Sequence, residues 1–195
     1  LSKTQLAGGE TTNLWNTRSA NQDINPATRN VLMADPAATG NKLKAFTWSN
    51  LGSLQELLHV NPESLVGAKD GRGSQRVDYI RGDRSLEGDA TSSFRTRSSS
   101  TVIGDIINSS PVVVGTPAYL AYLADAIEQP DRSNYQSYAT FREDNQKLRT
   151  NSDTGEVTGR KEMIYVGGND GMLHGFNAAT GVEEFAFIPT AVIQN

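Results

Sequence analysis

The chain has 195 residues, a formal net charge of −4 and a hydrophobic content of only 36%, and its frequent Gly, Ser, Thr and Asn favour a loop-rich, largely β protein. Acidic and basic residues alternate, which argues against a nucleic-acid partner and its basic patch, and no apolar run approaches the ~18 residues of a membrane span. Cysteine is absent, which excludes a disulfide framework, a thiolate metal site and a cysteine nucleophile.

Residues 1–30 are polar and contain glycine and proline turn signals, and a short helix is expected within them at 12–19. Two short apolar runs follow, at residues 29–34 and 43–47, and the residues between them include proline and glycine. This order of elements is typical of two antiparallel strands joined by a turn, so it predicts a β-hairpin.

A helix is predicted over residues 51–60, where leucines recur at i, i+3, i+6 and i+7 and form an apolar stripe. Ser49 and Asn50 precede it and are favourable N-cap residues, because their side chains can accept hydrogen bonds from free backbone N–H groups. Residues 75–82 predict a second short helix, and residues 84–100 predict a loop rich in serine and charge. The arginines of this region alternate with carboxylates, which favours a solvated or salt-bridged face.

Residues 109–115 predict a strand that is entered through a proline, a position typical of a first or edge strand. An insertion follows at about 118–160, with helices predicted over residues 118–127 and 134–149 and a polar linker at 150–160. Aromatic residues share one side of the second helix, and such a stripe usually faces a core. The insertion is therefore expected to pack on the rest of the domain, with a partner surface as the alternative.

The C-terminal part of the chain predicts three antiparallel strands, at residues 163–168, 172–177 and 183–188. The two turns between them, 169–171 and 178–181, each end in a glycine, which can take the positive φ that tight turns require. A three-stranded meander has two edges and a thin core, so it has to stack on further structure. A blade of a β-propeller meets this need best, and no second copy of the meander occurs in the chain.

The segment Tyr165-Val-Gly-x-Asn-Asp-Gly-x-Leu-His-x-Phe-Asn-x-x-Thr-Gly181 resembles the repeat of the quinoprotein (PQQ-type) eight-bladed propellers. In those repeats the second turn begins with aspartate and a tryptophan follows, whereas this chain has Asn177 and Phe185 at these positions. By this resemblance residues 109–115 would form the inner strand of the blade. One function that the resemblance allows is a PQQ-dependent dehydrogenase, which would need PQQ, a calcium ion and an aspartate base.

A narrower resemblance is carried by motifs that occur in a fixed order between residues 25 and 190. These are Phe46-Thr-Trp48, Arg76-Val-Asp-Tyr-Ile-Arg-Gly-Asp-Arg-Ser85, Phe94-Arg-x-Arg97, Gly104-Asp-Ile-Ile-Asn-Ser-Ser-Pro-Val-Val-Val-Gly115 and the strands within 163–187. Together they are similar to the C-terminal propeller domain of the PilY-type proteins of type IV pilus biogenesis. The resemblance implies a mainly β fold with helical insertions, as a partial quinoprotein-like β-propeller and a fragment of a larger domain. Residues 1–100 would form a mixed lead-in, and residues 101–195 the first blade with its helical insertion.

The same resemblance implies the role of the full-length protein. It implies an exported protein of the cell surface, pilus, outer membrane or periplasm that supports pilus assembly, counters retraction and mediates attachment without catalysis. The implied partners are minor pilins and host or abiotic surfaces. The PilY-type calcium loop belongs to a later part of the propeller, so no cofactor is expected in this chain and calcium is expected only in the full-length protein. A generic envelope propeller scaffold is a further alternative.

The triplet Arg81-Gly82-Asp83 is the candidate adhesion motif. Integrin-type recognition uses a cation and a carboxylate that are displayed on either side of a glycine turn, and this triplet has that composition. The alternative interpretation is structural, because an aspartate after a glycine commonly caps the next turn with its side chain. Both interpretations stay open at the level of sequence.

No catalytic, cofactor-binding or metal-binding residue is expected in the chain. The turn at 169–171 lacks the spacing of acidic residues that a calcium loop requires. His59 and His174 have no third ligand nearby in the sequence for zinc, and His174 is expected to be a hydrogen-bonded residue within its strand. The serines are not surrounded by the Gly-x-Ser-x-Gly elbow of a hydrolase nucleophile.

Overall fold

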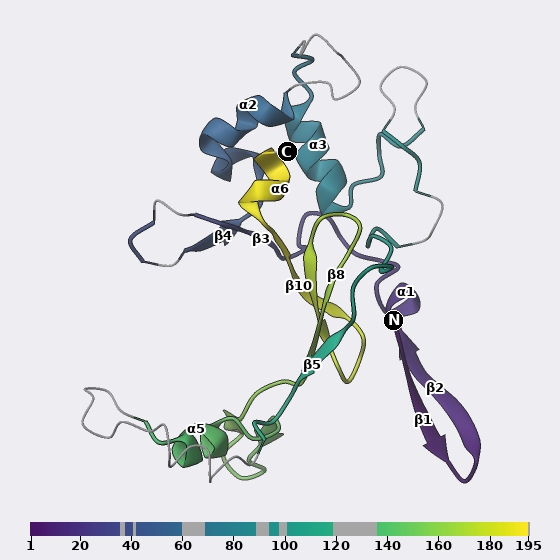
Figure 1. The fold of residues 1–195 in the computed structure, drawn as a ribbon, viewed down its shortest axis with the longest axis vertical. Helices are drawn as coiled ribbons and strands as arrows, with labels where there is room; N and C mark the ends of the chain where they lie inside the picture. The colour runs from purple at the N-terminus through teal and green to yellow at the C-terminus, as the bar shows by residue number, and fades with distance from the viewer. Residues whose placement is uncertain are drawn as a thin grey trace.

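The structure is a computed structural model, and it describes residues 1–35, 38–40, 42–59, 69–88, 94–97, 101–118 and 136–194. The architecture is mainly β with short helices, as expected from the sequence (Figure 1). One six-stranded sheet forms the centre, and two separate two-stranded hairpins lie outside it. Within the described residues the sheets are open, and no closed propeller is formed.

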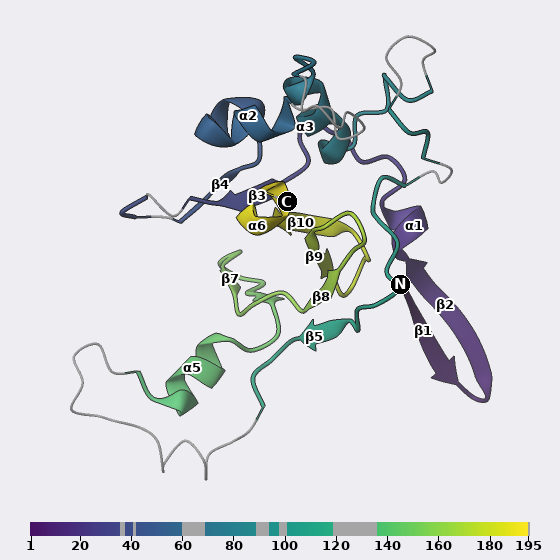
Figure 2. The same cartoon turned by 45° about the horizontal axis from the view of Figure 1, so that its top comes forward.

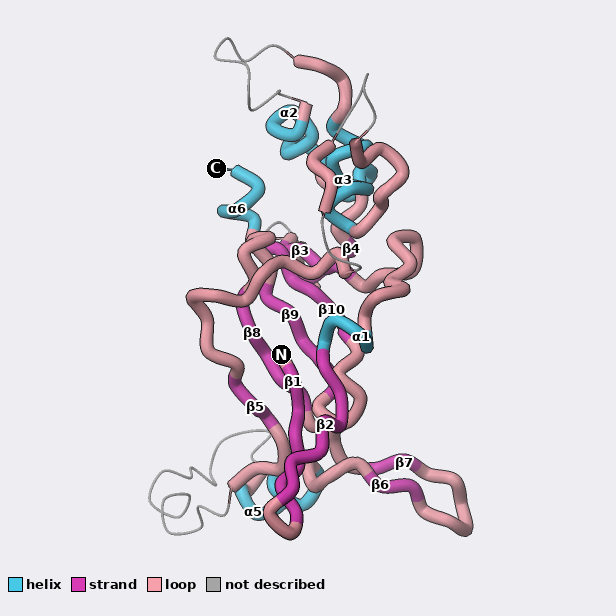
Figure 3. The backbone as a smooth tube through the Cα atoms, turned by 90° about the vertical axis from the view of Figure 1, so that its right-hand side faces the viewer, coloured by secondary structure: helices cyan, strands magenta, loops and turns pink. Residues whose placement is uncertain are grey.

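Three strands form the C-terminal meander that the sequence predicts. β8 (Met163–Gly167), β9 (Leu173–Asn177) and β10 (Glu183–Ile188) are antiparallel neighbours. The glycines that end the two turns have φ of 80° and 74°, a conformation that glycine adopts without steric cost. β5 (Val112–Val114) pairs with β8, so four antiparallel strands lie side by side (Figure 3).

The hairpin predicted in the first hundred residues is also present. β3 (Val31–Ala34) and β4 (Leu43–Ala45) are antiparallel, and β3 lies parallel to β10 with Val31 opposite Ala186. The strand order of the central sheet is therefore β4-β3-β10-β9-β8-β5. Hydrogen bonds of one sheet thus connect the beginning of the chain with its end.

Three short helices lie at one end of the sheet, as Figures 1 and 2 show. They are α2 (Gln55–Leu58), α3 (Gly73–Arg81) and α6 (Thr190–Gln194). α3 confirms the helix predicted at 75–82, and it ends at Gly82, whose φ of 119° supplies a left-handed C-cap.

α2 is shorter than the helix predicted over residues 51–60. Gly52 takes a φ of 56°, which interrupts an α-helix, and the chain forms two 3-10 turns, η1 (Trp48–Asn50) and η2 (Gly52–Leu54), before α2 begins. The predicted capping by Ser49 and Asn50 is wrong, because no side chain caps α2. Asn50 instead donates a hydrogen bond across the loop to a backbone carbonyl of β4.

The helix predicted over residues 12–19 is wrong for most of its length. β1 (Ser2–Ala7) and β2 (Glu10–Asn16) form a projecting hairpin, and only α1 (Thr17–Ala20) is helical. The reason is the pair Gly8-Gly9, whose φ values of 61° and 85° make the two-residue turn that suits the twist of a hairpin. Apolar residues that suggest a helix therefore lie on a strand.

The predicted insertion contains more strand than expected. α5 (Tyr138–Asp144) lies within the helix predicted at 134–149, and Ser137 caps it by accepting a hydrogen bond from a backbone N–H. The polar linker contains a small hairpin, β6 (Arg149–Thr150) and β7 (Val157–Thr158). The helix predicted at 118–127 lies almost entirely outside the described residues.

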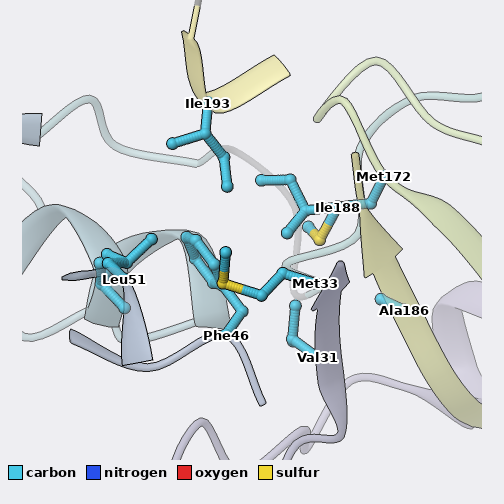
Figure 4. Packing of buried hydrophobic residues seen from close by; sticks show 9 residues of the cluster. Val31, Met33, Phe46, Leu51, Met172, Ala186, Ile188 and Ile193 are labelled. Carbon is cyan, nitrogen blue, oxygen red and sulfur yellow. The ribbon is translucent and has the colours of Figure 1, made fainter. Parts of the chain in front are cut away.

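The hydrophobic core lies between the helices and the adjoining end of the sheet (Figure 4). Residues of β3 and β10 contact residues of the helices and of the loops that carry them, and each core residue is at most 8% exposed. The buried members of this cluster are Val31, Met33, Phe46, Leu51, Val77, Met172, Ala186, Ile188 and Ile193. The core therefore joins the first hundred residues to the meander.

Candidate interaction surfaces and a buried ion network

The two faces of the central sheet differ in burial. We call one of them the closed face, because most of its side chains on the central strands are at most 3% exposed; these are Val31, Met33, Val166, His174, Phe176, Ala186 and Ile188. Toward the β5 edge of the same face burial decreases, since Ile164 is half-buried and Val113 is exposed. The opposite face, the open face, carries half-buried or exposed apolar side chains; it is formed by Leu32, Val112, Met163, Tyr165, Leu173, Phe185 and Phe187. Large uncovered apolar patches of this kind mark interaction surfaces.

Aromatic side chains dominate the open face. The rings of Tyr165 and Phe185 lie 6.1 Å apart between centroids, on either side of Gly175. A Cβ atom at Gly175 would lie 2.6 Å from the ring of Phe185, so only glycine leaves room for this arrangement. At the sheet edge, Val112 on the open face is 58% exposed and Val113 on the closed face is 61% exposed, so the edge strand β5 is uncovered on both faces.

A network of four charged side chains lies at the closed face. Arg29 donates two hydrogen bonds to Glu183, from Nε to Oε2 at 2.6 Å and from Nη2 to Oε1 at 2.9 Å. The same Oε1 lies 2.7 Å from Nδ1 of His174, and Nε2 of His174 lies 3.1 Å from Oδ1 of Asp170. The side chains of Arg29, Glu183 and His174 are 2%, 3% and 0% exposed, so the charges balance one another inside the protein.

Both ring nitrogens of His174 are therefore held by carboxylates. Burial opposes a charge on the ring, but hydrogen bonds with Asp170 and Glu183 outweigh it and raise the pKa of His174 to about 9. Burial also opposes the charge on Glu183, but hydrogen bonds with Arg29 and His174 hold the pKa of Glu183 below its usual value. Neither nitrogen of His174 is free to act as a base, which agrees with its predicted role as a hydrogen-bonded strand residue.

The structure places Arg81, the cation of the candidate adhesion triplet, in the interior. Arg81 is 9% exposed. Its guanidinium donates hydrogen bonds to the carbonyl groups of Phe46, Pro26 and Arg29 at 3.1, 2.8 and 2.9 Å. The side chain therefore joins α3 to the chain before β3 and to the end of β4.

Gly82 and Asp83 have the structural roles that the alternative interpretation of the triplet predicts. Gly82 is the C-cap of α3, and Oδ1 of Asp83 accepts a hydrogen bond from the backbone N–H of Ser85 at 2.7 Å. The backbone N–H bonds at Ser85 and Arg84 hold the pKa of Asp83 below its usual value. The adhesive use of the triplet stays a prediction, and it requires Arg81 to leave its buried acceptors.

Asn177, which replaces the aspartate of the quinoprotein repeat, has a local explanation. Its Oδ1 accepts a hydrogen bond from the backbone N–H of Ala179 at 2.9 Å, and its Nδ2 donates to Oε1 of Glu184 at 3.0 Å. An aspartate would keep the first bond but would place a second carboxylate beside Glu184. The amide therefore suits this turn better than the acid.

The second histidine, His59, has a structural role. His59 is the C-cap of α2 and packs edge-on against Trp48, with ring centroids 4.9 Å apart. Among the described residues, no group of three or more His, Asp or Glu side chains is arranged to hold a metal ion. None of the described helices has the length and hydropathy needed to cross a membrane.

Sequence reasoning missed the ion network and a cavity beside it. Arg29 and Glu183 are 154 positions apart and share no motif, so their pairing has no local signal. A charged residue at the start of an apolar strand was the only hint that Glu183 would need a buried partner. The cavity, of about 470 Å³, is lined partly by Asp170 and Tyr79 and is assembled from four segments of the chain.

Comparison with known proteins shows to which family the chain belongs. Residues 103–195 match the sequence model of the PilY1 beta-propeller domain, which places the four antiparallel strands in a β-propeller class. Across nearly its whole length the chain is also similar to curated PilY1 sequences. The chain belongs to the PilY1 family of type IV pilus biogenesis factors, as its motifs indicate.

Three relatives define this similarity. The chain is 44% identical over 189 residues to the type IV pilus biogenesis factor PilY1 of Pseudomonas aeruginosa strain UCBPP-PA14, which covers 96% of the chain and 14% of that protein. PilY1 of strain PAK is 41% identical over 186 residues, or 94% of the chain and 14% of that protein. A PilY1 homolog of Xylella fastidiosa strain Temecula1 is 35% identical over 156 residues, or 80% of the chain and 10% of that protein. The chain thus spans a small part of these relatives' length, and no solved structure is significantly similar to it.

Proposed function

We propose that the chain is a non-catalytic binding and scaffolding part of a type IV pilus biogenesis protein. In this proposal the full-length protein is exported to the cell surface, pilus, outer membrane or periplasm, supports pilus assembly, counters retraction and mediates surface attachment. The observation that carries the proposal is the 44% identity with a PilY1 protein over 96% of the chain. Minor pilins and host or abiotic surfaces are the proposed partners.

The geometry supports binding as the mode of action. The cluster of titratable side chains around His174 uses its ring nitrogens and carboxylates for internal bonds, whereas the open face carries aromatic rings that are only half-buried. We propose further that β5, β8, β9 and β10 are the first blade of a propeller, and that the following sheet of the full-length protein packs on the open face. Two stacked sheets would interdigitate such side chains about 10 Å apart.

The test is made in a piliated bacterium that carries the full-length gene. Removal of the segment that encodes this chain is expected to abolish surface pili, and inactivation of pilus retraction is expected to restore them. Phe185→Ser on the open face is expected to lower the number of sheared pili, whereas Val157→Ser, an equally polar change at an exposed valine of β7, is expected to leave it unchanged. Normal piliation without the segment would contradict the proposal, and absence of pili even without retraction would contradict its retraction part.

The adhesive part of the proposal has its own test. Asp83→Glu keeps the charge but lengthens the side chain, and it is expected to reduce cell attachment if the triplet is used for recognition. The thermal midpoint of the variant serves as the control for folding. Unchanged attachment with an unchanged midpoint would leave the triplet with its structural role alone.

The alternative function is that of a PQQ-dependent dehydrogenase, and a single assay tests it. PQQ and calcium are added to the full-length protein, and dye-linked alcohol oxidation is followed. We expect no turnover, since we propose that calcium binds a later part of the full-length protein without PQQ chemistry. Turnover that depends on PQQ would replace the scaffold proposal.

A further inference from the structure

A cavity of about 470 Å³ lies where four segments meet beside the ion network. α3 contributes Tyr79, the segments 95–97 and 101–105 line the cavity, and the β8–β9 turn contributes Asn169. Its volume lies within the ~300–1,000 Å³ of small-ligand sites. Its apolar lining residues are Ile80, Val102, Ile103 and Met172.

The walls of the cavity are fixed by bonds that do not involve a ligand. Asp170 accepts hydrogen bonds from the N–H groups of Gly104 and Met172, at 2.8 and 3.2 Å. Arg97 donates to the carbonyl groups of Tyr79 and Asp83 and lies 4.0 Å above the ring of Tyr79. The cavity is therefore built before any ligand arrives, which lowers the entropic cost of binding.

Three further polar side chains at the cavity are exposed to solvent and have no partner within the described residues, whereas Thr101 accepts a hydrogen bond from the backbone N–H of Ile103 at 3.2 Å. Arg95, Asp105 and Asn169 take part in no side-chain hydrogen bond or ion pair there. Together they supply guanidinium and amide donors, and carboxylate and amide acceptors. A ligand that fits them must both donate and accept hydrogen bonds and must carry little net charge.

Several ligand classes are excluded by the same geometry. A peptide strand would need free backbone groups, but the Asn169 N–H donates to Asp105, the Arg95 carbonyl accepts from Tyr79, and the Gly104 N–H is also used. A nucleic-acid base would need an open aromatic face, but Tyr79 lies between Phe94 and the guanidinium described above. An anion would meet two aspartates at the cavity and a single unpaired arginine.

We propose that this cavity is a carbohydrate-binding site. A sugar ring presents adjacent hydroxyl groups that donate and accept, which suits Arg95, Asp105 and Asn169. The C–H face of a sugar is apolar and suits the apolar lining residues, which include Met172. The proposal goes beyond the pilus role and does not depend on it.

The experiment uses the full-length protein that contains this chain, with galactose, mannose, N-acetylglucosamine and N-acetyllactosamine as probes. Saturation-transfer NMR identifies a bound sugar, and calorimetry gives its affinity. Arg95→Ala and Asp105→Ala are each expected to weaken binding by about tenfold or more, since each removes hydrogen bonds to a charged group. Glu143→Ala, which removes an exposed carboxylate from α5, is the matched control and is expected to bind normally.

A second measurement does not depend on variants at the polar groups. The methyl signal of Met172, assigned from Met172→Leu, is expected to shift when the sugar is added, because Met172 lines the cavity. The signal of Met33, which lies in the core, is expected to stay in place. The proposal would be overturned if none of the four sugars binds, or if both alanine variants bind the sugar with the affinity of the unmodified protein. An unchanged Met172 signal would also overturn it. Binding of tetraglycine in place of every sugar would overturn the ligand class.

Discussion

The closed and open faces of the central sheet are built from the same strands but have opposite surroundings. On β9 and β10, His174, Phe176 and Ala186 are fully buried, whereas their neighbours Leu173, Phe185 and Phe187 are exposed or half-buried. Because successive side chains of a strand point to opposite faces, each strand presents buried side chains on one face and more exposed side chains on the other. The closed face holds the domain together, and the open face remains available for contact.

The two faces also differ in how they use charge. The closed face contains a network that is neutral overall, with Arg29 and His174 set against Glu183 and Asp170. The open face is dominated by apolar and aromatic side chains. A buried network contributes little when intact but is costly to break, because a lost partner leaves a charge inside the protein. Stability and binding are thus divided between the faces, and mutations can separate them.

The largest expected effect comes from a large-to-small change on the closed face. Phe176→Ala removes a side chain that is 0% exposed and is expected to lower the free energy of unfolding by about 3–5 kcal/mol. Phe185→Ala on the open face is expected to lower it by only about 1 kcal/mol, because a half-buried ring gains part of the hydrophobic stabilisation. Urea denaturation of both variants measures the contrast, and equal losses would show that the faces do not differ.

A slightly smaller effect is expected from the charge network. Arg29→Ala leaves Glu183 buried beside a single cation and is expected to lower the free energy of unfolding by about 3 kcal/mol. Lys161→Ala breaks the exposed pair with Glu184 and is the matched control, with an expected loss of at most about 1 kcal/mol. If the Arg29→Ala and Lys161→Ala variants unfold at the same urea concentration, the network does not stabilise the closed face.

The network also predicts a loss of stability at alkaline pH. The pKa of His174 is raised from 6.5 to about 9 in the folded protein, so protonation stabilises the fold fully below pH 6.5. This stabilisation declines as the pH rises and is lost above about 9. The thermal midpoint is therefore expected to fall between pH 7 and 9.5. His174→Gln should abolish most of this slope, and a persistent slope would assign it to other groups.

The smallest effect is expected at the turn between β9 and β10. Asn177→Asp restores the acid of the quinoprotein repeat but places it beside Glu184, which accepts a bond from Asn177 at 3.0 Å. The expected loss is under about 1 kcal/mol, because the site is partly exposed to solvent. High salt should reduce the loss by screening the two carboxylates. A loss that does not depend on salt would mean that the stability comes from the hydrogen bond of the amide and not from repulsion between two carboxylates.

Local signals were sufficient to predict the C-terminal meander and the β3–β4 hairpin, but not how they join in one sheet. The strands at 163–188 and their turns follow from alternating apolar residues and from glycines at the turns, and they occur as predicted. The parallel contact of β3 with β10 could not be predicted, because pairing between distant segments depends on the whole fold. At residues 12–16, a short helix carrying Leu14 and Trp15 was expected, but the Gly8-Gly9 turn pairs this segment with β1 as a strand.

The candidate sites show the same limit. Arg81 and Asp83 stand out in the sequence because they form a known triplet, yet the arginine is used inside the protein. Arg29 and Glu183 carry no motif, and their role appears only when the chain's ends are brought together. The cavity lined by Arg95 is likewise assembled from separate segments, so no spacing pattern could reveal it.

The parallel contact between β3 and β10 has a mechanical consequence. Tension applied through the chain before Val31 and after Ile188 pulls the two strands from opposite ends, because parallel strands begin at the same end of the sheet. The hydrogen bonds between them then share the load together and do not open one after another. The Arg29–Glu183 pair lies beside the start of both strands and bears the same load. Under such tension this junction would resist pulling in shear, with all of its hydrogen bonds loaded at once.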